Sequence, residues 1–179
     1  MHFTIDKDYR GEKFSFPVET GDVVKKAKAF GYYDASRNTV VVDHGLGTNL
    51  YLSAKVLAHE FHHAMVFTGT SEELRGIRSR TVEIEIRAMK RLTVWISMVV
   101  LAAIVGASTR NEMVLVGMFA IIIPGVFVIF AARRMWLTAN EVLEAYACQY
   151  ADDNWEEFIG FAQLFQFVTA PAGATFTAP

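Results

Sequence analysis

The residues that most constrain this chain are His59, Glu60 and His63, which form a His-Glu-x-x-His pattern inside the apolar run 56–65. On an α-helix, residues four apart lie on the same face, so the two imidazoles can converge on one metal ion with Glu60 beside them. Zinc-dependent hydrolysis needs two such ligands, an open position for water and a carboxylate base. We therefore predict His59 and His63 as metal ligands and Glu60 as the base. His62 lies about 100° around the helix from His63, which predicts a surface or supporting position.

The sequence around the pattern favours a buried helix. No Pro or Gly occurs from Leu50 to Thr68, Thr48 or Asn49 can cap the start, and Gly69 supplies a stop signal. The competing interpretation is an amphipathic helix with incidental histidines. The combination of pattern and context favours the metal site.

Two long uncharged runs predict that part of the chain lies in a membrane. The sequence has 179 residues, of which 53% are hydrophobic, and this is too apolar for an ordinary soluble protein of that size. The runs Leu92 to Thr109 and Met113 to Ala132 approach the roughly 20 residues that cross a hydrocarbon core. We predict a transmembrane hairpin over 92–132. Two buried core helices would need more amphipathic material to cover them than this chain supplies.

Basic residues flank both ends of the predicted hairpin. Arg87, Lys90 and Arg91 precede it, and Arg133 and Arg134 follow it. Because both clusters lie on the same side, the positive-inside rule places both termini and the His-Glu-x-x-His helix in the cytoplasm. The charged N-terminal residues lack an apolar core, so no signal peptide is predicted.

Charge and cysteine content exclude some functions. The formal net charge is −2, and no dense basic cluster with interleaved aromatic residues occurs, so nucleic acid is not an expected partner. The single cysteine excludes an intramolecular disulfide and fits a reducing compartment.

The N-terminal third predicts a small β element. Two alternating segments, His2 to Ile5 and Lys13 to Phe16, suggest an extended segment or a weak hairpin, and a helix can run from Asp22 to Phe30 and close at Gly31. The β-branched run Thr39 to Asp43 predicts a strand. This strand could form the rim of a cleft, with a free edge for an extended peptide, or it could pack under the metal-site helix.

A catalytic zinc ion takes three protein ligands and a water molecule, so a third ligand is needed. Glu141 and Glu144 lie one turn apart on one face of a predicted helix after the hairpin. Spacing alone leaves both open.

The order of these features resembles that of the HtpX-like and CAAX-prenyl-protease-like membrane zinc peptidases. These gluzincin-type enzymes take their third ligand from a glutamate in a downstream Glu-x-x-Ala-Asp pattern. The stretch Glu144 to Cys148 is similar to that pattern, with Cys148 in place of the final Asp. The HtpX-like enzymes also place two transmembrane segments between the histidines and this glutamate. The resemblance covers roughly residues 39–151.

This resemblance implies one zinc ion per chain, bound by His59, His63 and Glu144, and peptide-bond hydrolysis by a zinc-bound water that Glu60 activates. The alternative alignment, with Asn140-Glu141 as the Asn-Glu of soluble gluzincins, keeps Glu141 open as the third ligand. The motif match favours Glu144.

The chain departs from these families in two ways. It lacks their additional N-terminal spans, so it resembles a minimal version. Cys148 stands where the families have an Asp that supports a zinc-ligand histidine. Either Asp152 or another group takes over this support, or the site binds metal less tightly.

We thus expect a mainly α fold with a small β element, a minimal gluzincin (zincin) catalytic domain with an inserted two-helix transmembrane hairpin. The expected parts are a cytoplasmic catalytic part (1–91), the hairpin (92–132), the third-ligand and C-terminal helices (133–168) and a flexible tail (169–179). The expected function is that of an integral-membrane zinc metalloendopeptidase acting on protein or peptide substrates, including membrane-associated ones. One alternative is a catalytically silent zinc-binding scaffold or regulator, against which the intact Glu60 argues, and another is a zinc hydrolase that does not act on peptide bonds.

Overall fold

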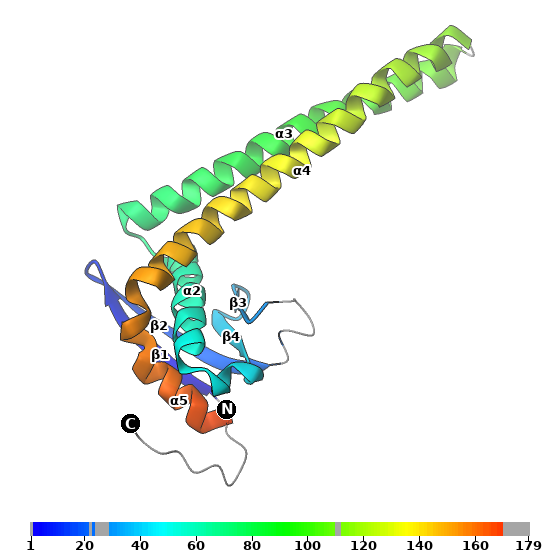
Figure 1. Ribbon diagram of the computed structural model, residues 1–179. Helices are drawn as coiled ribbons and strands as arrows, with labels where there is room; N and C mark the ends of the chain where they lie inside the picture. Colours follow the sequence, from blue (N-terminus) through cyan, green and yellow to red (C-terminus); the bar gives the residue numbers. More distant parts are fainter. Residues whose placement is uncertain (1, 22, 24–28, 110–111, 170–179) are drawn as a thin grey trace. The chain divides into compact units, whose positions relative to one another are not determined.

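The computed structural model describes residues 2–21, 23, 29–109 and 112–169. The chain divides into two compact units, one formed by Met1–Arg78 with Leu143–Pro179 and the other by Ser79–Val142. The described residues are mainly helical, with one four-stranded sheet (Figure 1), which confirms the mainly α class with a small β element.

The sheet belongs to the first unit and has the order β1-β2-β4-β3. Its strands are β1 (His2–Tyr9), β2 (Glu12–Gly21), β3 (Gly31–Asp34) and β4 (Thr39–Asp43). Strand β2 pairs antiparallel with β1 and parallel with β4, and β3 pairs antiparallel with β4.

The predicted N-terminal hairpin is present and longer than the sequence indicated. Tyr9 pairs with Glu12, so only Arg10 and Gly11 form the turn. Their φ angles are 50° and 81°, both in the left-handed region. Two such residues make a turn whose twist matches that of the flanking strands, which lets the hairpin extend without interruption.

The predicted strand Thr39 to Asp43 is confirmed as β4, but the prediction that it offers a free edge is wrong. Strand β4 lies between β2 and β3, and both of its edges are paired. The edge position is taken by β3, whose first residue, Gly31, the sequence interpretation had assigned to the end of a helix. The predicted helix from Asp22 to Phe30 falls mostly on residues outside the described set.

The central helix is α2 (Leu50–Thr68), which packs on the sheet. Asn49 caps its start, because the side-chain oxygen accepts a hydrogen bond of 3.0 Å from the Leu52 N–H. The fully buried ring of Phe61 packs against Phe16 of β2 and against Phe158, with ring centroids 5.2 and 5.4 Å apart. These aromatic contacts fix which face of α2 is buried.

Five further helical segments belong to the described residues. A 3₁₀ turn, η1 (His44–Thr48), precedes α2, and a second, η2 (Trp155–Phe158), leads into α5 (Ile159–Thr169). Between them lie the long helices α3 (Glu72–Thr109) and α4 (Glu112–Asn154). The second predicted span and the third-ligand region are therefore parts of one continuous helix.

Within the unit Ser79–Val142, α3 and α4 run side by side (Figure 1). Among the described residues, one helical segment, Glu72–Val105, is long and apolar enough to cross a membrane, and its apolar window is almost entirely exposed. The second predicted span, Met113 to Ala132, lies in α4, where the side chains of residues 112–124 are outside the described set.

Gly69 lies where α2 ends and the chain turns toward α3. A Cβ atom there would collide with the Leu74 side chain and lie 2.7 Å from the Met65 carbonyl oxygen. We predict that Gly69→Ala lowers the free energy of unfolding by about 1–3 kcal/mol, as overpacking does. Gly76→Ala is the matched control, because nothing lies within 4 Å of its Cβ position. Equal stability of the two variants in chemical unfolding of the detergent-solubilised chain would contradict this close approach.

Candidate metal centre

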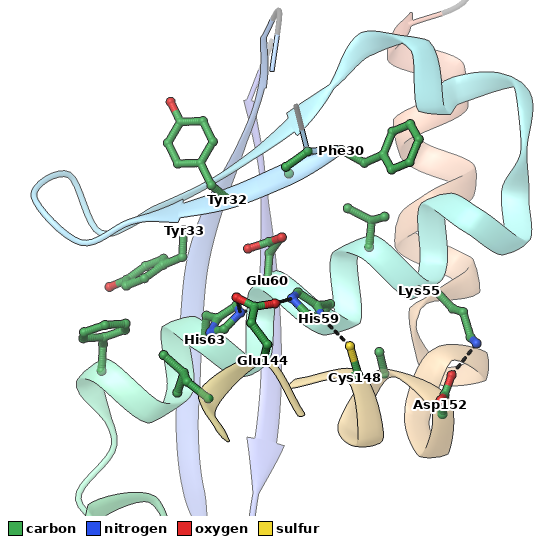
Figure 2. A pocket seen from close by; sticks show the side chains of 16 residues that line it. Phe30, Tyr32, Tyr33, Lys55, His59, Glu60, His63, Glu144, Cys148 and Asp152 are labelled. Atoms are coloured by element: carbon green, nitrogen blue, oxygen red, sulfur yellow. Dashed lines mark hydrogen bonds and ion pairs between the residues drawn. The ribbon is translucent and has the colours of Figure 1, made fainter. Parts of the chain in front are cut away.

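Helix α2 brings the two predicted histidine ligands together. His59 and His63 lie one turn apart, and their Nε2 atoms are 3.1 Å from each other. His63 is buried, whereas His59 is partly exposed at the surface of a cavity. Both rings point toward Glu144 of α4 (Figure 2).

The carboxylate of Glu144, in α4, lies close to both imidazole rings. Its Oε2 atom lies 3.1 Å from His59 Nε2, and its Oε1 atom lies 3.3 Å from His63 Nε2. Figure 2 shows the three side chains converging. Glu141 is not among the residues whose ligand atoms meet in this group. The geometry therefore favours Glu144 among the two glutamates that spacing had left open.

These three residues fit a zinc ion in both donor chemistry and spacing. Two imidazoles and one carboxylate form a common ligand set of catalytic zinc sites. For metal–ligand distances of about 2.0–2.1 Å and tetrahedral angles, neighbouring ligand atoms lie about 3.3 Å apart. The two imidazole nitrogens, 3.1 Å apart, are close to this separation, and the two oxygens of the Glu144 carboxylate lie 3.1 Å and 3.3 Å from them. The residues could thus occupy three corners of a tetrahedron and leave the fourth for water.

The pKa shifts of His59 and Glu144 favour the forms that bind a cation. Burial, followed by the neighbouring His63, lowers the pKa of His59. A hydrogen bond from His63 is the largest cause that lowers the pKa of Glu144. Neutral imidazole and ionised carboxylate are the forms that bind a metal ion.

Glu60 lies beside the group and is held against the edge strand. Its side chain is 7% exposed, and burial raises its pKa to about 7. The backbone N–H of Tyr33 donates a hydrogen bond to its carboxylate. Strand β3 can approach so closely because residue 31 is glycine: a Cβ there would lie 3.0 Å from Glu60 Cγ and 3.0 Å from Val56 Cγ1.

The group opens into a cavity of about 720 Å³ between α2, β3 and the last part of α4. Aromatic side chains line much of it, including Tyr33 and Phe67, whose ring centroids are 5.8 Å apart. An ion pair between Lys55 of α2 and Asp152 of α4 also lines the cavity (Figure 2). A cavity of this volume is in the range of ligand-binding sites in proteins.

His62 has no place in this group, in agreement with its predicted position around the helix. It is 4% exposed, packs on Tyr150 with ring centroids 5.0 Å apart, and burial lowers its pKa to about 4. The prediction that His62 is not a metal ligand agrees with this arrangement, and the predicted surface position does not.

The sequence interpretation missed the contribution of β3. Gly31, Tyr32 and Tyr33 all line the cavity, and Tyr33 contacts the Glu60 carboxylate. A signal was present: two tyrosines precede the turn that starts at Asp34, and a β-branched run follows it. This pattern is typical of a hairpin.

Comparisons with protein-family models, with curated proteins and with solved structures found no match to this chain.

The two glutamates can be separated by metal binding. We predict that Glu144→Ala abolishes stoichiometric zinc binding at neutral pH, because it removes one of three converging ligands, whereas Glu141→Ala retains it. Zinc content by elemental analysis after dialysis checks this. Loss of zinc from the Glu141 variant alone would reassign the third ligand.

Proposed function

We propose that this chain is a membrane-anchored zinc metalloendopeptidase of the gluzincin type, similar in plan to the HtpX-like and CAAX-prenyl-protease-like enzymes. The observation that carries the proposal is the convergence of His59, His63 and Glu144 beside the buried carboxylate of Glu60. A purely structural metal site has no use for such a base, which favours an enzyme over a silent zinc-binding scaffold or regulator.

A zinc ion bound by His59, His63 and Glu144 would polarise the substrate carbonyl group and lower the pKa of water. The chain itself supplies the proton transfer. Because burial raises the pKa of Glu60 to about 7, its carboxylate can take a proton from water near neutral pH and return it to the leaving amine. The Tyr33 N–H fixes the direction of the carboxylate.

Strand β3 is where we expect the substrate to bind. It is an edge strand that pairs with β4 on one side, and its residues line the cavity. An extended peptide can add to such an edge through main-chain hydrogen bonds. The peptide carbonyl would then lie between the three ligands and Glu60.

For the membrane we propose the two spans predicted from the sequence, with the catalytic unit on the cytoplasmic side. The exposed apolar segment of α3 supports one span. The basic residues at both ends of the hairpin, Arg87, Lys90 and Arg91 together with Arg133 and Arg134, support the orientation. Substrates would then be protein segments that reach the cytoplasmic membrane surface.

The proposed base is tested by Glu60→Gln. This variant should retain zinc, since Glu60 is not among the converging ligands, and should lose about 10²–10⁴-fold in the hydrolysis of an unfolded protein substrate. Glu156→Gln, an exposed glutamate, serves as the control. Retained turnover in Glu60→Gln would remove Glu60 as the base. A zinc-loaded wild-type chain that hydrolyses nothing would favour the silent scaffold.

The close approach of β3 gives a second test. Gly31→Ala should displace Glu60 or Val56 by a few tenths of an ångström and reduce kcat by about tenfold or more, while zinc stays bound. Gly160→Ala, with nothing within 4 Å of its Cβ position, should leave turnover unchanged. Wild-type kcat in Gly31→Ala would show that strand β3 does not position the base.

A further inference from the structure

The imidazole of His59 is contacted at both of its nitrogen atoms by residues of α4. Its Nε2 atom faces Glu144 at 3.1 Å, and its Nδ1 atom lies 3.8 Å from the sulfur of Cys148. Glu144 and Cys148 are four residues apart, so they lie one turn apart on the same face of the helix. Figure 2 shows the thiol against the far side of the ring from the carboxylate.

The position of the sulfur matters because of how histidine binds a metal ion. A neutral imidazole that offers the lone pair of Nε2 carries its hydrogen on Nδ1. That N–H needs an acceptor, which fixes the tautomer and the orientation of the ring. Cys148 Sγ is within reach to accept this bond, although a thiol sulfur is a weak acceptor.

The nearby carboxylate of Asp152, which could have accepted this hydrogen bond instead of the Cys148 sulfur, is engaged elsewhere. Asp152 lies one further turn along α4 and forms an ion pair with Lys55 of α2. The thiol of Cys148, in contrast, is exposed in the cavity that contains the three ligands. The geometry therefore does not favour Asp152 as the group that supports His59, a possibility that the sequence had left open.

We propose that Cys148 is a positioning residue of the metal centre, which holds His59 through Nδ1, and that modification of this exposed thiol weakens metal binding. The inference rests on the proposed function, because it assumes that His59 binds zinc. It adds that the zinc affinity of this chain is lower than it would be with a carboxylate at position 148. It also adds that this affinity depends on whether the Cys148 thiol is modified.

The first test is the zinc dissociation constant of the full chain in detergent, measured by competition with a chromophoric chelator. Cys148→Ala should weaken zinc binding about 10-fold or more, in the range found when such supporting groups are removed. Cys148→Asp should bind zinc more tightly than the wild type, since a carboxylate accepts the Nδ1–H bond better. Gln149→Ala, an exposed neighbour on the same helix, should leave the constant unchanged.

The second test uses N-ethylmaleimide on the metal-free chain, which contains a single cysteine. The thiol adds across the maleimide double bond, so that a carbon–sulfur bond forms and the thiol proton ends on the adjacent carbon. The modified chain should bind zinc at least 10-fold more weakly, as Cys148→Ala does. Cys148→Ser, which has no thiol, should not respond to the reagent.

Two results would overturn the inference. One is a Cys148→Ala variant that binds zinc as tightly as the wild type, and the other is a Cys148→Asp variant that binds it no more tightly than Cys148→Ala. Unchanged zinc affinity in fully alkylated wild-type protein would also overturn the inference. This measurement does not depend on whether a variant folds. If the wild type binds no zinc at all, the proposed function fails together with the inference.

Discussion

The packing of α2 on the sheet is the interaction on which the rest of the site depends. Phe61 is fully buried between Phe16 and Phe158, and burial of one such ring stabilises the fold by about 1.5–3 kcal/mol. Because one face of the helix is fixed in this way, His59 and His63 point to the cavity. The same packing desolvates Glu60, which is why its pKa rises to about 7.

The parts of the structure that the sequence predicted are those set by local spacing. Residues four apart on a helix share a face wherever the helix lies, so the pairing of His59 with His63 needed only the correct helix. The two ends of helix α2 were also set by local residues, because Asn49 caps its start and Gly69 follows its last turn. The β-branched composition of β4 was sufficient to predict a strand.

Features that depend on contacts distant in the sequence were not predictable in this way. The position of β4 between two strands follows from the parallel pairing of Val18 with Val40, and no local pattern encodes that pairing. The close approach of Gly31 to Glu60 depends on how the hairpin of β3 and β4, in which Gly31 pairs with Val42, packs against α2. The choice between Glu141 and Glu144, and the contact of Cys148 with His59, depend on which face of α4 points toward α2. That orientation is not encoded in the local sequence.

The measurement that tests the central claim most directly is the zinc content of the full chain, purified in detergent and dialysed at neutral pH after exposure to zinc. The account predicts one zinc ion per chain and none in a chain that carries both His59→Ala and His63→Ala. Wild-type protein that remains folded and binds no zinc would contradict it, because the three side chains would then meet without forming a metal site.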